Sequence, residues 1–334
     1  MEEIRFVGVD VGKQELHVAY KHTTKGGKLK VKHRQFANNA DAIMKLVAWV
    51  NKSFAPGEVA QFIMEATGSY HELAATTLAE QGYRVSVVNP ARTKSFGESI
   101  GVRTKTDAKD ALVLAEYGEA LHPPVWEAPP KEYQVLMDYL RAIGSRKKEK
   151  IRIQNRIESM KVRVDFPAEI VAEEERILQE LEESIKRLEK AIEDHVDNYS
   201  GLKDEVKLVE TIKGLGLKTS LLFVALMSGG SRFNSAREAA SYVGLSVTER
   251  QSGTSVHGRS RLSKRGDGEV RKALYWPAVT AIRFNVDVKA LYERLRAKGK
   301  PKMVAIGAAM RKLVHIAFGV LKHRTPYVPQ ISMD

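Results

Sequence analysis

The sequence predicts an α/β plus α protein, with a mixed-sheet domain, a helical linker and a mostly helical C-terminal domain. Three observations predict this order. Short apolar runs alternate with turn residues and then with helical patterns over the first 125 residues. Two long helical patterns follow, separated by Pro167. Apolar residues at helical spacing then return in the last third of the chain. We therefore expect domains at 1–125, 126–200 and 201–334.

The first domain is expected to begin with three strands joined by short turns and to continue with alternating strands and helices. The expected strands cover 3–9, 15–21, 28–36, 58–65 and 84–89, and the expected helices cover 39–51, 69–82 and about 107–119. Asn39 is a candidate N-cap. Strands that begin antiparallel and later alternate with helices give a mixed sheet flanked by helices, which is the ribonuclease-H-like order.

The second domain is expected to be a helical hairpin or coiled coil. The first helix covers about 131–163 and is ended by Pro167, and the second runs to about Asp197. The second carries a heptad seam of apolar residues at spacings of 3 and 4: Leu178, Leu181, Ile185, Leu188 and Ile192. This seam is equally consistent with packing between the two arms and with a dimer contact.

The third domain contains two helical patterns around Gly214 and Gly216, which resemble a helix-hairpin-helix turn that can approach a DNA phosphate. This signal is weak by itself because such turns are common. A loop rich in Ser, Gly and Arg is expected at 246–268, with helices from about Glu269 to His323.

Composition excludes several classes of protein. The chain has no cysteine, so it has no disulfide, thiolate nucleophile or cysteine-bound zinc. Apolar runs such as Leu221 to Met227 are shorter than the roughly 20 residues of a membrane span, and no signal peptide is recognised. We expect an intracellular protein without a membrane partner.

Charge is segregated along the chain, which has a net charge of +13. Residues 131–163 carry 10 basic and 4 acidic groups, 164–210 carry 6 and 15, and 231–324 carry 20 and 6. Basic segments of this kind neutralise nucleic-acid phosphates. The alternative is a basic protein whose charged faces are merely solvated.

Four acidic residues stand at positions where carboxylates could converge. Asp10 and Glu65 each follow an apolar strand, and Asp107 and Asp110 share one face at the start of a helix. Four carboxylates close together repel one another unless a divalent cation lies among them, so the cluster implies Mg²⁺ or Mn²⁺. Taken singly, Asp10 could be a turn residue and Asp107 an N-cap.

The chain resembles the transposases of the insertion-sequence-110 family, which are related to pilin-gene invertases. The resemblance covers nearly the whole chain. The matching motifs are Gly8-Val9-Asp10-Val11, Glu65-Ala66-Thr67-Gly68-Ser69-Tyr70, Val88-Asn89-Pro90, Lys105-Thr106-Asp107-Ala108-Lys109-Asp110-Ala111, Trp126-Glu127-Ala128-Pro129, Gly244-Leu245, Gln251-Ser252-Gly253, Gly258-Arg259-Ser260-Arg261-Leu262-Ser263-Lys264 and Arg271-Lys272-Ala273-Leu274-Tyr275. Ser246-Val247 departs from the family, since many relatives have proline after Gly-Leu.

The resemblance implies a RuvC-like domain with a DEDD metal site, a coiled-coil linker and a C-terminal transposase domain with Ser252 as nucleophile. It also implies a bacterial cytoplasmic, nucleoid-associated recombinase that binds donor and target DNA and a structured bridge RNA. Dimers would assemble to a tetramer and exchange strands through 5′-phosphoserine intermediates. Composition alone could not select Ser252 over the other serines of its loop, and would favour a turn residue there.

Basic residues on the first helical arm and around the serine are the expected nucleic-acid contacts. They are Arg146, Lys147, Lys148, Arg152, Arg156, Arg259, Arg261, Lys264 and Arg271. Charge does not decide which segment binds RNA and which binds DNA.

Four other functions fit parts of the sequence. A Holliday-junction nuclease or an invertase without an RNA guide would keep the metal site. A non-catalytic nucleic-acid binder would keep only the basic surfaces. A sugar-kinase-like enzyme shares the motif Asp10-Val11-Gly12, but the Asp-X-Gly-Gly phosphate motif of such kinases is missing from the chain.

Overall fold

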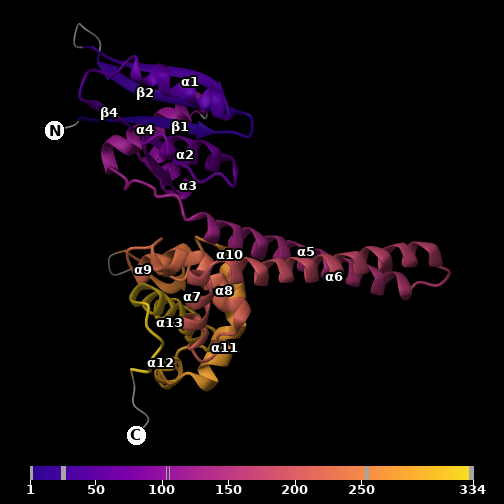
Figure 1. The fold of residues 1–334 in the computed structure, drawn as a ribbon. Helices are drawn as coiled ribbons and strands as arrows, with labels where there is room; N and C mark the ends of the chain where they lie inside the picture. The colour runs from indigo at the N-terminus through magenta and orange to yellow at the C-terminus, as the bar shows by residue number, and fades with distance from the viewer. Residues whose placement is uncertain (1–2, 24–27, 103, 105, 253–255, 331–334) are drawn as a thin grey trace. The chain divides into compact units, whose positions relative to one another are not determined.

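The computed structural model describes residues 3–23, 28–102, 104, 106–252 and 256–330, and the side chains of residues 249–259 lie outside this description. The chain forms two compact units, residues 1–128 and 129–334. The second unit holds both the long helical hairpin and the C-terminal helices (Figure 1). The three-domain division of the sequence stays a prediction.

The first unit is built on a five-stranded sheet with the order β3-β2-β1-β4-β5. The strands are β1 (Glu3–Val11), β2 (Glu15–Thr23), β3 (Leu29–Ala37), β4 (Glu58–Glu65) and β5 (Arg84–Val88). Strands β1, β2 and β3 pair antiparallel, whereas β4 pairs parallel with both β1 and β5. The mixed sheet and the place of each expected strand are confirmed. The RuvC-like identity of this fold stays a prediction.

Helices cover both faces of this sheet. Helices α1 (Ala40–Asn51) and α2 (Tyr70–Glu80) pack on one face, where Leu46 and Leu78 join the buried valines of β1. The expected N-cap is confirmed, because the Asn39 side chain accepts a hydrogen bond from the Ala42 amide. Helices α3 (Pro90–Ser99) and α4 (Asp107–Leu121) belong to the other face. Helix α3 was not expected from the sequence.

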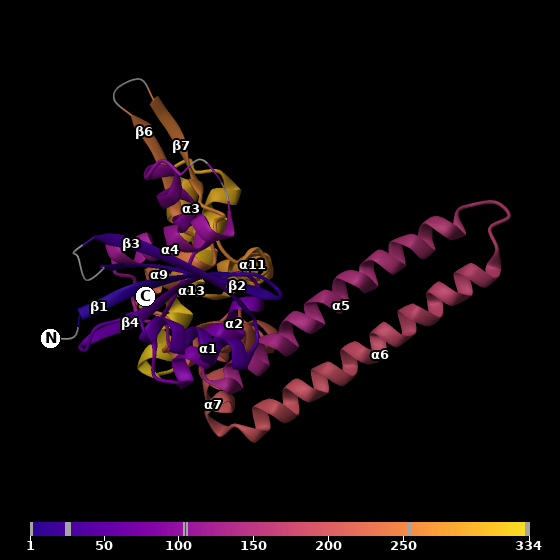
Figure 2. The same ribbon diagram turned by 90° about the horizontal axis from the view of Figure 1, so that it is seen from above.

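Helices α5 (Lys131–Lys161) and α6 (Ala168–Asn198) form a hairpin that extends from the other helices of the second unit (Figure 2). Ile153 and Ile157 of α5 are buried, as are Ile185 and Ile192 of the α6 seam. The seam therefore packs within the hairpin. Helix α5 ends at Lys161, before Pro167, which instead precedes the first turn of α6. Coiled-coil supercoiling stays a prediction.

The rest of the second unit is mostly helical. Its elements are α7 (Ser200–Glu210), α8 (Leu217–Met227), the 3-10 turn η1 (Ser228–Gly230), α9 (Ala236–Tyr242), β6 (Val247–Ser252), β7 (Val256–Leu262), α10 (Gly268–Ala273), α11 (Tyr275–Phe284), α12 (Val286–Ala297) and α13 (Lys302–His323). The expected loop at 246–268 is wrong in part, because β6 and β7 pair there as an antiparallel hairpin. Its many Ser, Gly and Arg residues hide the alternation of a strand.

Helix α13 is the longest apolar helix of the described chain, and by length and composition it could cross a membrane. The short apolar runs considered in the sequence did not predict it. Its most apolar window is 61% buried, and Leu313, Val314 and Ala317 are fully buried in the core of the second unit. In this structure α13 is therefore the central core helix.

Gly214 joins α7 to α8 in a left-handed conformation with φ of 103°. A Cβ at this position would overlap Ala281 of α11. Glycine is required here by the turn and by the close helix packing. A contact between this turn and a DNA phosphate stays a prediction.

Candidate metal centre and recombinase residues

Asp10 lies near the carboxyl end of β1 on the sheet face that α4 covers. Side chains alternate along a strand, so Asp10 shares its face with Gly8 and Phe6. Val7, Val9 and Val11 point to the opposite face and are buried against α1 and α2. Asp10 is a strand residue paired with His17 of β2 and not a turn residue.

Two glycines bring α4 directly onto this face. A Cβ at Gly8 would overlap the carbonyl oxygen of Ala111, and a Cβ at Gly118 would overlap Phe6 and Ile63. Helix α4 therefore runs antiparallel to β1, with Gly118 over Phe6 and Ala111 over Gly8. The start of α4 must then lie beside Asp10, which explains the glycine of the Gly8-Val9-Asp10 motif.

Asp107 and Asp110 occupy the first turn of α4. The side chain of Thr106, and not that of Asp107, caps this helix by accepting from the Lys109 amide. Asp107 is thereby left to face the sheet, and one carboxylate oxygen from each of Asp10, Asp107 and Asp110 lies within 4.8 Å of the others. Oxygen ligands at such spacings fit a divalent cation of the Mg²⁺ type.

Glu65 ends β4, the parallel neighbour of β1, on the same face as Ile63. The buried hydroxyl of Thr93, on α3, donates a hydrogen bond to a Glu65 carboxylate oxygen. Glu65 is outside the group of three aspartates defined by the 4.8 Å spacing. The negative charge of Glu65 nevertheless acts on Asp10, because it contributes to the raised pKa of the Asp10 carboxyl.

The electrostatics of Asp10 reflect crowding by acids. Burial, and then the charges of Asp110, Asp107 and Glu65 in that order, together raise the pKa of the Asp10 carboxyl from 3.8 to about 6. The nearby His17 lowers the same pKa. All four acids are therefore electrostatically coupled at one edge of the sheet, and a bound cation would relieve their repulsion.

Comparison with known proteins agrees with this arrangement of the acids. Residues 7–162 match a family model described as a transposase, and residues 206–293 match the transposase IS116/IS110/IS902 family. The pilin gene-inverting protein of Moraxella bovis is 30% identical over 329 residues, which is 98% of each chain, and that of Moraxella lacunata matches equally. The chain belongs to the IS110 family of transposases. An insertion element IS110 protein of 43.6 kDa from Streptomyces coelicolor is 28% identical over 120 residues, covering 36% of this chain and 29% of that protein.

As a member of this family, the transposase is a DNA recombinase and a DNA-binding protein. The acidic centre lies in the part of the chain that matches the first family model. The β6–β7 hairpin lies in the part that matches the second. The acidic residues and Ser252, the two expected catalytic groups, thus lie in parts of the chain that match different family models.

Ser252 is the last residue of β6, where its backbone pairs with Val256 of β7. Its side chain and that of Arg259 fall outside the described residues. Arg261 and Lys264 are exposed near the base of the hairpin. Arg271 is held in the fold, since its guanidinium donates to the carbonyl oxygens of Val243 and Lys264. The structure therefore gives Arg271 a role in shaping the base of this hairpin.

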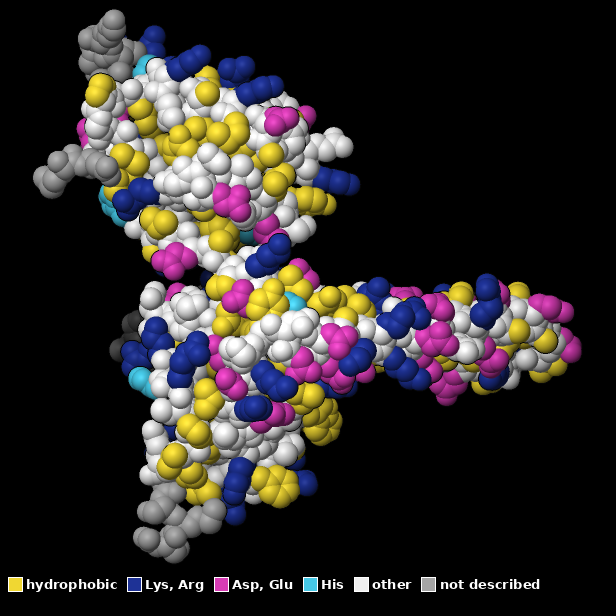
Figure 3. All heavy atoms as spheres, in the orientation of Figure 1, with side chains coloured by type: hydrophobic (Ala, Val, Ile, Leu, Met, Phe, Trp, Pro, Cys, Tyr) yellow, Lys and Arg dark blue, Asp and Glu magenta, His cyan; other side chains and the backbone are white. Residues whose placement is uncertain are grey.

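The five basic residues of α5 that were expected to contact nucleic acid each have a partner within the second unit. Arg146 donates to the Ser184 hydroxyl, and Arg152 pairs with Glu149. The remaining pairs are Lys147–Glu189 at 2.9 Å, Lys148–Glu269 at 2.8 Å and Arg156–Glu174 at 2.9 Å. Dark blue and magenta side chains accordingly alternate along the hairpin in Figure 3. Nucleic-acid binding by this arm stays a prediction, beside a structural role that sequence reasoning did not assign.

Two residues near the acids were missed in the sequence. Thr93 orients Glu65 through its hydrogen bond. Its position shortly after the Asn89-Pro90 motif is the one sequence signal that could have indicated this role. His17 lies opposite Asp10, with its Nε2 atom 3.5 Å from an Asp107 oxygen and its ring stacked on His33 at 5.6 Å between centroids. The alternation of β2 could have placed His17 on this face once its register with β1 was known.

Proposed function

We propose that this transposase cleaves and exchanges DNA strands with the help of Mg²⁺ or Mn²⁺ held by Asp10, Glu65, Asp107 and Asp110. The observation that carries the proposal is the convergence of three aspartate oxygens within 4.8 Å. Family membership supplies the DNA substrate. A RuvC-like arrangement of the first unit accounts for the same four acids, because it brings two strand ends and one helix start together.

Divalent cations at such a centre would neutralise phosphate charge and orient a phosphodiester for in-line displacement. The protein's own contribution is to hold the four carboxylates in place. Gly8 allows Asp107 and Asp110 to approach Asp10, while Thr93 fixes the orientation of Glu65. Hydrogen bonds that orient metal ligands in this way strengthen binding as well as geometry.

We further propose Ser252 as the nucleophile. Its hydroxyl oxygen attacks the phosphorus of the DNA strand, a Ser–O–P bond forms, and the bond from phosphorus to the 3′ oxygen breaks. The serine hydroxyl loses its proton, the leaving 3′ oxygen takes up a proton in turn, and the 5′-phosphate stays on the serine. A 3′-hydroxyl from another strand then reverses the chemistry and releases the serine. Cations such as Arg261 and Lys264 would stabilise the charge that develops on the phosphate.

The proposed partners are donor DNA, target DNA and a structured bridge RNA that pairs with both, with dimers assembling to a tetramer. Support comes from the family and from the 20 basic against 6 acidic residues between positions 231 and 324. Phosphate contacts made by such a surface fix the position of a nucleic acid without reading its sequence. Base pairing with a guide RNA would supply the sequence specificity.

The deciding experiment uses a DNA strand labelled at its 3′ end that contains a recombination site. Wild-type protein with Mg²⁺ should become covalently labelled, and the label should be lost in Ser252→Ala. Asp10→Ala and excess EDTA should each abolish both labelling and recombination. Ser263→Ala is the matched control and should retain both. Labelling of Ser252→Ala would exclude Ser252 as the nucleophile, and full activity in EDTA would exclude the metal.

Site-specific inversion without an RNA guide is the second candidate function. It is favoured by the pilin gene-inverting proteins, which match 98% of the chain. Sequencing of the RNA that co-purifies with the protein separates the two. One RNA with two loops complementary to DNA supports guidance, whereas recombination that survives ribonuclease treatment supports the unguided invertase.

A further inference from the structure

A groove of about 840 Å³ in the second unit shares Lys264 with the reaction proposed above, and its other lining residues have no part in that reaction. It is lined by α5, the end of β7, α10, α11 and α13. All of these elements belong to one unit, so the groove is a property of that unit alone. Two features of its lining point to the same kind of ligand.

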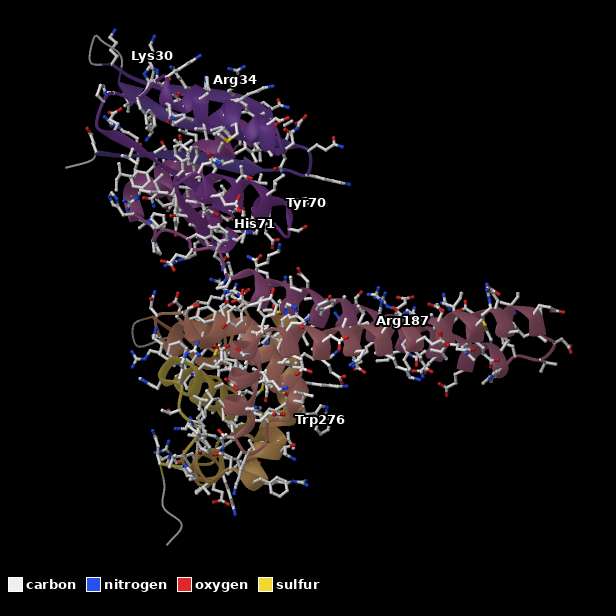
Figure 4. The ribbon with its side chains drawn as sticks, viewed as in Figure 1. Lys30, Arg34, Tyr70, His71, Arg187 and Trp276 are labelled. Carbon is white, nitrogen blue, oxygen red and sulfur yellow. The ribbon has the colours of Figure 1, made fainter. Side chains whose placement is uncertain are left out.

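The first feature is exposed apolar surface. Trp276 is 72% exposed, Met303 62% and Ile151 57%, and all three line the groove. Figure 4 shows Trp276 projecting away from the ribbon of the second unit. Its indole meets the Tyr275 ring edge-on, with ring centroids 5.2 Å apart. A neighbouring aromatic ring thus supports the indole while its outer face stays open to a ligand.

The second feature is positive charge. Five of the described lining residues are basic and one, Glu269, is acidic. Glu269 pairs with Lys148 of α5 at 2.8 Å, and Arg271 is held by two carbonyl oxygens. Lys264 and Lys272 have exposed side chains at the rim. An anionic ligand with flat apolar parts matches both features.

We propose that this groove binds an unpaired DNA strand, with a base stacked on Trp276 and its phosphates beside Lys264 and Lys272. Exposed aromatic rings next to lysines are the usual means of holding single strands, because every base offers a face for stacking. A duplex conceals its base faces, whereas strand exchange must expose them. The inference rests on the DNA recombinase activity and extends the proposed function by giving the separated strand a place to bind.

The test uses full-length protein and an oligodeoxythymidine of about 12 nucleotides, a typical length for one single-strand site. Binding should quench the fluorescence of Trp276, and Trp276→Phe should remove most of that quenching. Trp276→Ala should weaken binding about tenfold, while Trp276→Phe keeps most of the affinity. Phe284→Ala is the matched control, since Phe284 is a 63% exposed aromatic of the same helix that does not line the groove.

The charged rim is tested through the dependence of binding on salt. The double variant Lys264→Gln/Lys272→Gln should lower the slope of log affinity against log salt by about 1.4 units, since each phosphate contact on a single strand contributes about 0.7. The double variant Lys298→Gln/Lys300→Gln removes two exposed lysines outside the groove lining and should leave the slope unchanged. Thermal unfolding of each variant verifies that it is folded.

Several results would overturn the proposal. The first two are an affinity of Trp276→Ala equal to that of the wild type, and a loss of affinity in Phe284→Ala as large as that in Trp276→Ala. The other two are duplex DNA that binds as tightly as the single strand and depends equally on Trp276, and single-stranded RNA that binds through Trp276 in preference to DNA. Dissociation of an oligomer in Trp276→Ala would instead identify a second copy of the chain as the occupant. Covalent labelling of Ser252 is measured separately, so a failure of the groove is distinguishable from a failure of the proposed function.

Discussion

The acidic centre of the first unit and the α5–α6 hairpin of the second both concentrate charge, but they manage it in opposite ways. In the hairpin, basic residues of α5 meet acidic residues of α6, as in the pairs Lys147–Glu189 and Arg156–Glu174. In the first unit, burial and the convergence of like charges together raise the pKa of Asp10 to about 6. Ion pairs within the hairpin indicate that its charged residues stabilise the fold. Like charges that repel one another in the first unit indicate instead a site that binds a ligand.

Removal of the close approach between α4 and β1 should have the largest effect. Gly8→Val places a side chain where the Ala111 carbonyl lies, which would move Asp107 and Asp110 away from Asp10. We expect the free energy of unfolding to fall by about 3 kcal/mol, as in other overpacked cores, and recombination to be lost. Urea unfolding and a plasmid recombination assay measure the two effects.

Gly201→Ala is the control for this substitution. Gly201 lies in α7 with open space around its Cβ position, so alanine there should raise stability by up to about 1 kcal/mol. A Gly8→Val protein with unchanged stability and activity would show that the approach of α4 does not build the acidic centre.

Loss of the hydrogen bond from Thr93 to Glu65 should have the second-largest effect, which is on the Mg²⁺ requirement of recombination. Thr93→Val keeps the shape of the buried side chain but removes the hydroxyl, so Glu65 loses a partner that orients it. We expect the Mg²⁺ concentration needed for half-maximal recombination to rise about tenfold or more. Ser95→Ala, which removes an exposed hydroxyl bound only to its own helix, should leave that concentration unchanged. An equal response from both variants would refute the positioning role of Thr93.

Burial of the Asp10 carboxylate, together with repulsion from its acidic neighbours, should lower stability in the absence of metal. Because the folded pKa of Asp10, about 6, lies above the ordinary aspartate value of 3.8, the folded state loses stability as pH rises from about 4 through 6. Asp10→Asn should therefore be more stable than wild type by about 1–2 kcal/mol in EDTA at pH 7, after allowance for solvent screening. The difference should vanish near pH 4. Thermal unfolding in EDTA across this range measures it, and a less stable variant at pH 7 would contradict the repulsion.

The paired hairpin should give the smallest effect. Arg156→Glu sets two acids against each other at Glu174 and should cost about 1 kcal/mol of stability, and the double variant Arg156→Glu/Glu174→Arg should restore it. Nucleic-acid affinity, measured by fluorescence anisotropy, should be the same in wild type and the double variant if the pair is structural. Restored stability with lost affinity would show that Arg156 contacts nucleic acid directly.

Local pattern predicted most elements of the first unit, because each strand is bounded by turn residues and each helix has a clear start. Helix α3 escaped prediction because it is a short polar helix that begins at Pro90 and has little apolar periodicity. The β6–β7 hairpin escaped because its strands are polar and derive their order from pairing with each other. The sequence predicted that all four acids converge, and the structure brings an oxygen of each of the three aspartates within 4.8 Å. The hydrogen bond from Thr93 to Glu65 depends on a tertiary contact that no local pattern records.

The most direct test of the metal centre is a calorimetric titration of Mn²⁺ into metal-free protein at neutral pH. Wild type and Asp41→Asn, which changes an exposed acid on α1, should bind the ion with saturation. Asp10→Asn and Asp107→Asn should each lose this binding, because each removes one of three converging oxygens. Unchanged Mn²⁺ binding in both Asp10→Asn and Asp107→Asn would contradict the assignment of these acids as a metal site.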